Sequence, residues 1–134
     1  MLVAKQRKAA RTDLDAGPDP RVRELCATTV LISAAGEIDA CNADEVAGRI
    51  ESGLAGYRQL VLDLTAVTFC GTAGFAVLSR LDTHCRHAGL DWVLVPGNEV
   101  QRLLRICDPG GRIPTAGNIV AAAARLTSKE FRTA

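Results

Sequence analysis

The sequence predicts an α/β domain built on a mixed, mostly parallel β-sheet of four or five strands, with about four helices. Short apolar runs rich in β-branched residues alternate with segments whose apolar residues recur every three or four positions. Strands that alternate with helices are typical of parallel sheets joined by right-handed crossovers. Aromatic residues make up only 4% of the chain, so Val, Leu, Ile and Ala have to build the core.

Residues 1–20 are predicted to form a flexible tail, and residues 21–134 a single domain. The tail carries a short basic stretch: Lys5, Arg7, Lys8 and Arg11. Two interpretations remain open, a solvated tail, which the composition favours, and an arm that binds phosphate or acidic groups. Pro18 and Pro20 then exclude a helix and start an extended entry into the domain.

The first elements of the domain are two strands and a helix. Charged and apolar residues alternate from Arg21 to Cys26, which indicates an edge strand, and residues 28–33 form a stronger strand dense in β-branched side chains. Gly36 is expected to close that strand, and Asp39 or Asn42 to cap a helix that Gly56 ends. The apolar face of this helix has four-residue spacing: Val46, Ile50 and Leu54.

The most hydrophobic run, Leu60–Leu64, predicts a buried central strand between the strands near Val30 and Trp92. Residues 65–74 are small and polar, and are predicted to form a turn. A helix follows, which Gly89 stops. Its apolar positions are Phe75, Val77, Leu78, Leu81 and Cys85.

The last third of the chain repeats the alternation. Residues 92–95 predict another buried strand, which Pro96 and Gly97 end, and Asn98 is a candidate cap for the next helix. Residues 108–111 break that helix, Ile113 marks a short last strand, and residues 118–126 form an Ala-rich final helix. The predicted core contains Val61, Leu62, Leu64, Leu78, Leu81, Val93 and Leu103.

Composition narrows the classes of function. A net charge of +1 argues against a dedicated nucleic-acid binder, because such proteins need a surplus of Lys and Arg. The chain has neither an apolar run of about 20 residues nor the apolar region of a secretory signal, so a cytoplasmic protein without membrane contact is expected. Five cysteines without a CxxC pair fit neither a zinc site nor a disulfide framework.

No residues form a catalytic pattern, so the sequence predicts a binding protein that is not an enzyme and needs no cofactor or metal. His84 and His87 lie near the end of a predicted helix, which is typical of surface histidines. The segment 71–74 lacks the spacing and the Lys of a phosphate-binding loop. Thr72 lies at or next to a helix N-cap, where a phosphate would meet free N–H groups. It is interpreted either as a capping residue or as a site of phosphorylation.

Two segments together resemble the STAS domain of anti-sigma factor antagonists: the turn Gly36-Glu37-Ile38-Asp39, and Phe69 to Gly74 between a strand and a helix. The resemblance implies a STAS-like fold and binding to an anti-sigma factor, often a serine/threonine kinase of the histidine-kinase-like ATPase type. It implies that Thr72 is the residue phosphorylated by that kinase. The partner-binding residues implied are Gly36, Glu37, Asp39, Gly71, Thr72, Ala73, Gly74 and Phe75. Where the family usually has Asp and Ser around the acceptor, this chain has Gly71 and Ala73.

An alternative interpretation is a redox-responsive STAS regulator. Cys70 lies at the end of the central strand, and Cys107 lies at the end of the third predicted helix. Because these two ends can point to the same side of a small sheet, the two thiols can lie near each other. A disulfide between them would switch binding of an anti-sigma partner without phosphorylation. Two unrelated buried thiols are the simpler interpretation.

Overall fold

A computed structural model describes residues 20–133 of the chain. The described residues form four strands and four helices. Their bounds are β1 Arg21–Cys26, β2 Thr29–Ile38, α1 Ala43–Ser52, β3 Gln59–Cys70, α2 Thr72–Ala88, β4 Asp91–Pro96, α3 Asn98–Cys107 and α4 Ile119–Thr133. The predicted α/β class is confirmed. The predicted tail lies outside the described residues except for Pro20.

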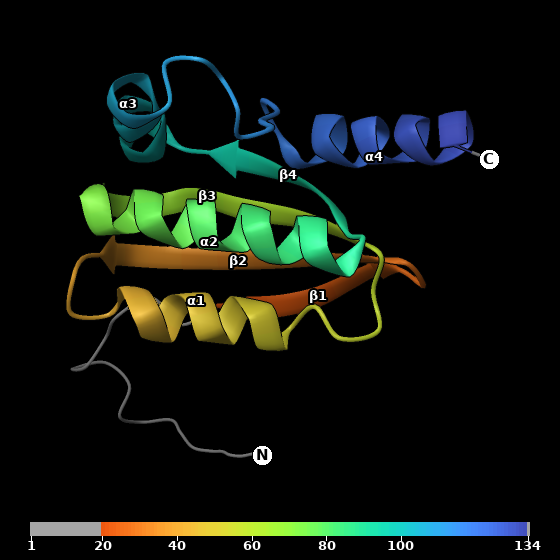
Figure 1. The fold of residues 1–134 in the computed structure, drawn as a ribbon, viewed down its shortest axis with the longest axis horizontal. Coiled ribbons are helices and arrows are strands. Elements are labelled where there is room, and N and C mark those ends of the chain that lie inside the picture. The colour runs from red at the N-terminus through yellow and green to blue at the C-terminus, as the bar shows by residue number, and fades with distance from the viewer. Residues whose placement is uncertain (1–19, 134) are drawn as a thin grey trace.

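The strands form one mixed sheet in the order β1-β2-β3-β4 (Figure 1). β1 pairs with β2 in the antiparallel sense, whereas β2, β3 and β4 are parallel. Val30 lies opposite Leu60, and Leu60 lies opposite Trp92. The run Leu60–Leu64 is therefore flanked by the two strands that the sequence predicts beside it.

Successive side chains of the strands point to opposite faces of the sheet, so the domain has two separate cores. Leu60, Leu62 and Leu64 of β3 pack with residues of α1, α2 and α3 in the larger cluster. Val61, between them, packs on the other face with Leu126 of α4 in a smaller cluster. All seven predicted core residues are buried.

Two strands are longer than predicted, which changes the shape of the region around Gly36. β2 continues through Gly36, whose φ of +89° suits glycine, and ends at Ile38. β3 continues to Cys70, since residues 66–70 pair with residues 35–38 of β2 through two irregularities in the register. Most residues of the two predicted turns, 36–39 and 65–74, therefore belong to strands.

The predicted strand at Ile113 is wrong, because only a single parallel bridge forms there. Leu94 N–H donates to the Pro114 carbonyl at 2.8 Å, and Ala116 N–H donates to the Leu94 carbonyl at 2.9 Å. The next bonds of a parallel ladder would need N–H groups at Pro96 and Pro114, and proline has none. Two prolines thus stop the ladder in both directions.

The predicted helices are present, with shifted ends. α1 ends at Ser52, so Gly53 rather than Gly56 is its C-cap. Gly89 ends α2 in the left-handed conformation, as predicted. Within residues 20–133, none of the helices combines the length and the apolar character needed to cross a bilayer.

Candidate functional site

The start of α2 has no side chain that caps it. Gly71 occupies the N-cap position with extended backbone angles, φ −82° and ψ −175°, and no acidic residue lies in the first turn. The first backbone N–H groups of a helix lack partners inside the helix and carry a partial positive charge. This end of α2 is therefore suited to an anionic group.

Thr72 is the first residue of α2, next to the N-cap, and its side chain is exposed. Its hydroxyl makes no hydrogen bond with the part of the chain that the structure describes. Thr72 therefore does not act as the capping residue. The hydroxyl is accessible to a partner or to a modifying enzyme.

The two segments of the predicted surface lie side by side. Gly71 N–H donates to the Ile38 carbonyl at 3.2 Å, which joins the end of β2 to the start of α2. Asp39 shapes the turn after β2, because its Oδ1 accepts hydrogen bonds from the N–H groups of Cys41 at 2.9 Å and Asn42 at 3.2 Å. Asp39 thus has a structural task, and the exposed Glu37 projects from the end of β2.

The remaining predicted contact residues differ in accessibility. Ala73 is half-buried, Phe75 is half-buried against the larger core, and Gly74 is buried. A Cβ atom on Gly74 would lie 2.2 Å from the Sγ of Cys70, so Gly74 leaves the space that this thiol fills. Gly74 and Phe75 support the surface from beneath.

Phe69 is an exposed aromatic residue that the sequence reasoning missed. It is 48% exposed, pairs with Glu37 across the strands, and lies beside Gly71, where a Cβ would be 3.5 Å from the ring. Its position next to the buried Cys70 was the available signal, since neighbours on a strand point to opposite faces. The alternation applies only to a strand, whereas residues 65–74 are predicted as a turn.

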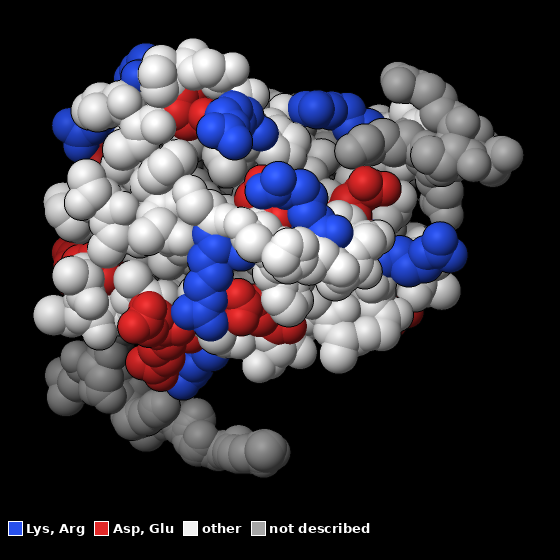
Figure 2. All heavy atoms as spheres, viewed as in Figure 1, with Lys and Arg blue, Asp and Glu red and all other residues white. Residues whose placement is uncertain are grey.

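The first half of α2 carries no charge. Residues 72–79 contain no Asp, Glu, Lys or Arg, and their exposed members are small: Thr72, Ala76 and Ser79. Figure 2 shows a broad uncharged area on the left of the molecule, over this half of the helix. We call Phe69, Thr72, Ala73 and Ala76 the α2-start surface.

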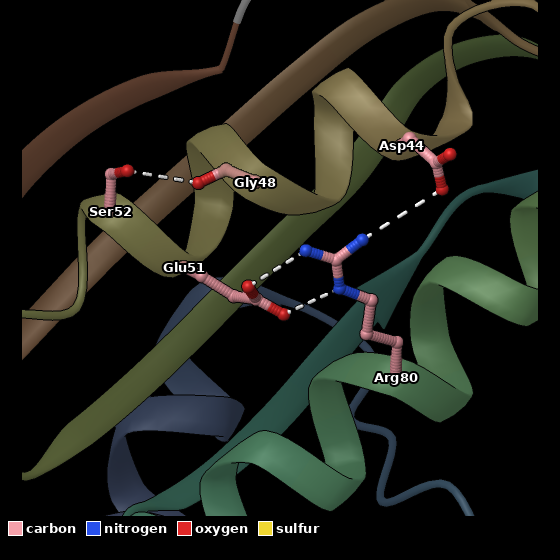
Figure 3. Close-up of polar contacts among 5 residues, drawn as sticks. All are labelled: Asp44, Gly48, Glu51, Ser52 and Arg80. Carbon is pink, nitrogen blue, oxygen red and sulfur yellow. Dashed lines mark hydrogen bonds and ion pairs between the residues drawn. The ribbon is translucent and has the colours of Figure 1, made fainter.

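An ion-pair cluster borders this surface on the side of α1. The Arg80 guanidinium, from α2, binds the Glu51 carboxylate through two hydrogen bonds of 2.9 and 3.0 Å and lies 3.8 Å from Asp44 (Figure 3). These groups are at the surface, so their contribution to stability is small, about 0–1 kcal/mol. Their effect is to orient α1 against α2.

Cys70 and Cys107 both lie against the larger core, and both are free thiols. Burial raises the pKa of Cys70 to about 11. Because the thiolate is the reactive form, only about one Cys70 side chain in ten thousand would be ionised at pH 7. The redox alternative stays a prediction, and this burial works against it.

The described residues offer little for catalysis. Within residues 20–133, no group of three or more His, Cys, Asp or Glu side chains is arranged to hold a metal ion. His84 is half-buried and His87 is exposed, both on α2.

Comparison with known proteins identifies a matching domain family and a similar protein. The STAS domain family matches residues 17–122. Osmosensory protein A of Mycobacterium tuberculosis (strain ATCC 25618 / H37Rv) is 38% identical over 85 residues, which are 63% of this chain. The chain spans about half of that relative, 52% of its length.

Solved structures share the fold at low identity. An anti-sigma factor antagonist from Mycobacterium paratuberculosis superposes with a TM-score of 0.70 at 22% identity, covering 81% of this chain and 93% of that one. SpoIIAA in its unphosphorylated form gives 0.66 at 14% identity, covering 82% and 97%. The phosphorylated form of the Bacillus SpoIIAA gives 0.60 at 14% identity, covering 81% and 99%.

Proposed function

The chain belongs to the STAS domain family, and we propose that it is an anti-sigma factor antagonist, which binds an anti-sigma factor and thereby frees a sigma factor. Family membership and the fold shared with two proteins described as such antagonists support this role. Such a protein acts by binding, not by catalysis. The proposal implies a cytoplasmic location, where sigma factors act.

The observation that carries the proposal is the α2-start surface. An uncharged patch of small side chains with one exposed aromatic residue is what a protein interface needs at its centre, where charged residues are depleted and aromatic residues are enriched. Phe69 is large enough to fill a pocket on the partner, and Thr72 and Ala76 are small enough to allow close approach. Glu37 lies at the border.

We propose further that the partner is a serine/threonine kinase of the histidine-kinase-like ATPase type, and that it phosphorylates Thr72. The phosphoryl group would pass from ATP to the exposed hydroxyl, leaving ADP and a proton. A phosphate there adds about −1.5 to −2 charges at the uncapped N-terminus of α2, which tolerates an anion. The helix stays folded while an uncharged interface gains a charge, so binding weakens.

Gly71, which stands where the family usually has Asp, is compatible with this regulation. Its φ of −82° is open to every residue type, and a Cβ would lie at ordinary contact distance from the Phe69 ring, 3.5 Å. The position therefore accepts a side chain, and Gly71→Asp tests the effect of the family's acid. The similarity to Osmosensory protein A favours osmotic stress as the condition that controls this switch.

The test is calorimetric titration of the full chain with the anti-sigma factors of its own host. We expect Thr72→Ala to bind as wild type, and Thr72→Glu and Phe69→Ala to bind at least about tenfold more weakly. Val120→Ala is the matched control, because Val120 is an exposed apolar residue of α4, outside the proposed interface. If all four variants bind like wild type, or if no anti-sigma factor binds, the proposal is wrong.

Regulation is tested separately by incubation with the bound partner and ATP. Mass spectrometry should detect one added phosphate in wild type and none in Thr72→Ala. Binding measured with and without reductant, in wild type and Cys70→Ser, tests the redox alternative. A reductant effect that Cys70→Ser abolishes, together with no phosphate on Thr72, would favour that alternative.

A further inference from the structure

A groove lies on the side of α3 that faces the loop leading to α4. It has a volume of about 660 Å³ and is lined by the end of β4, one flank of α3 and the loop. Six of its lining residues carry the argument: Pro96, Leu104, Arg105, Asp108, Ile113 and Thr115. The volume falls within the usual range for ligand sites, about 300–1,000 Å³.

The groove is held open by specific contacts. The Asp108 carboxylate accepts hydrogen bonds from the N–H groups of Arg112 at 3.0 Å and Ile113 at 2.9 Å, one on each oxygen. The Leu94–Thr115 bridge fixes the far end of the loop, and Arg125 of α4 donates to the Thr115 carbonyl. These contacts set the path of the loop before anything binds.

The charge around the groove is positive. Arg105 lines it, Arg112 is an exposed residue between two lining positions, and Arg125 adjoins Thr115. Among the side chains that the structure describes, neither the Arg105 nor the Arg112 guanidinium forms an ion pair with a carboxylate. Asp108 is the one acid among the groove's lining residues, and its oxygens already accept backbone hydrogen bonds. Figure 2 shows several basic side chains along the upper border, over α3 and this loop.

The lining also has an apolar part. Pro96 and Ile113 are buried at its base, and Leu104 is half-buried on its α3 side. An apolar side chain bound in the groove would pack beside them, and a carboxylate next to it would lie on the side of the arginines. Guanidinium groups pair with carboxylates through two parallel hydrogen bonds, which favours this geometry.

We propose that this groove binds an acidic peptide segment of a partner protein, with one apolar side chain in the groove and flanking carboxylates on Arg105 and Arg112. None of the lining residues belongs to the α2-start surface, so the two sites do not overlap. A partner that carries such a segment outside its folded part would be held at a second point. Linked binding of this kind increases affinity through effective concentration.

The experiment uses the full chain and an array of short peptides in which Leu, Ile or Phe is flanked by Glu, Lys or Gly. We expect the chain to select peptides with an apolar residue flanked by Glu. In fluorescence anisotropy, Arg105→Glu should weaken the best peptide by roughly tenfold or more, since it places like charges together. Arg58→Glu is the matched control, because Arg58 is exposed and lies just before β3, at the opposite end of the sheet.

Any one of five outcomes overturns the proposal. The array selects nothing above background, or it selects peptides without acidic residues. Arg58→Glu weakens binding as much as Arg105→Glu does, which would indicate a general charge effect. Replacing the apolar residue of the peptide by Gly changes nothing, or inorganic phosphate at low millimolar concentration displaces the peptide, either of which would indicate a simple anion site. Thermal melts of both variants check that they are folded.

Discussion

Gly74 and Cys70 fill one space beneath the first turn of α2. In an ordinary helix, replacing Gly by Ala adds about 0.5–1 kcal/mol of stability. Here the new methyl group would collide with the Cys70 thiol, 2.2 Å away, so we expect Gly74→Ala to lower the free energy of unfolding by about 1–3 kcal/mol instead. Urea unfolding monitored by circular dichroism measures the change.

The same pair supplies its own control. Cys70→Ala removes the sulfur that the methyl group would meet, so Gly74→Ala should cost less in the Cys70→Ala background than alone. A Gly74→Ala variant as stable as wild type would mean that the thiol moves aside without cost. The result also bears on Cys70 as a redox residue, because a thiol confined in this way has little freedom to reach Cys107.

Cys26, the last residue of β1, is the thiol predicted to react near neutral pH. A hydrogen bond with the Thr28 side chain, 3.5 Å away, is the main cause that lowers the pKa of Cys26 to about 7. Because the thiolate is the nucleophile, alkylation by iodoacetamide should rise with pH and reach half its maximum rate near pH 7. The alkylation rate is measured in the Cys41→Ser variant, which lacks the second exposed thiol.

Two comparisons make this prediction specific. Thr28→Val should move the midpoint to higher pH, since it removes the strongest hydrogen bond to the thiolate. Cys70 and Cys85 should stay unmodified in the folded protein, because burial raises their pKa values to about 11 and about 12. A midpoint near the ordinary thiol value of about 8.5 in the Cys41→Ser protein would contradict the effect of Thr28.

At the scale of elements, a buried amide ties α4 to the sheet. Gln59 is 5% exposed; its Oε1 accepts a hydrogen bond from the Thr29 hydroxyl at 2.7 Å, and its Nε2 donates to the Leu126 carbonyl at 3.0 Å. Gln59→Leu removes the acceptor of the buried Thr29 hydroxyl and the donor to the Leu126 carbonyl, so we expect a loss of about 1–3 kcal/mol in the free energy of unfolding. Amide exchange in α4 should accelerate most.

The control is the same substitution at an exposed Gln. Gln101→Leu on α3 should change the free energy of unfolding by less than about 0.5 kcal/mol. If Gln59→Leu left the free energy of unfolding unchanged, or if amide hydrogen exchange accelerated as much in α2 as in α4, the Gln59 side chain would not be what holds α4 on the sheet.

The middle of each main element was predictable from the sequence, and the ends were not. Leu60 to Leu64 are apolar because both faces of the central strand are covered, and hydropathy records that directly. Residues 66–70 form a strand because their backbone pairs with β2; Val67, Thr68 and Phe69 favour a strand, but the small residues on either side of them favour a turn. The bridge between Leu94 and Thr115 stops at two prolines. A proline ends a ladder only where its missing N–H group would have bonded to the neighbouring strand, and the sequence does not show which positions those are.

At the scale of the molecule, the central strand joins the two cores. Leu64 is 2% exposed and packs in the larger cluster, so Leu64→Ala should lower the free energy of unfolding by about 2–5 kcal/mol through lost burial and a cavity. A single domain of this size usually unfolds in one step, so near- and far-ultraviolet circular dichroism in urea should shift together. Transitions that separate would mean that the two cores unfold independently.

The two candidate surfaces differed in how far the sequence revealed them. Thr72 was located by its resemblance to a family motif, and the structure adds its exposure and the uncapped helix beside it. Phe69 was missed because its direction depends on the length of β3. The groove by α3 could not be predicted from the sequence. Its lining residues Leu104, Ile113 and Thr115 come together through the path of the loop, which the Asp108 carboxylate fixes.

The order of the strands in the sheet is the order in which a ribosome makes them. β1 and β2 can pair first, and each later strand then finds its neighbour already in place, with no gap left in the sheet for a strand made later. Translation is slow, about 5–20 residues per second, compared with the folding of small α/β domains. The larger core can therefore assemble from the N-terminal side while synthesis continues. Only the face that carries Val61, Val93 and Val95 has to wait, because its cover, α4, is translated after the other described elements.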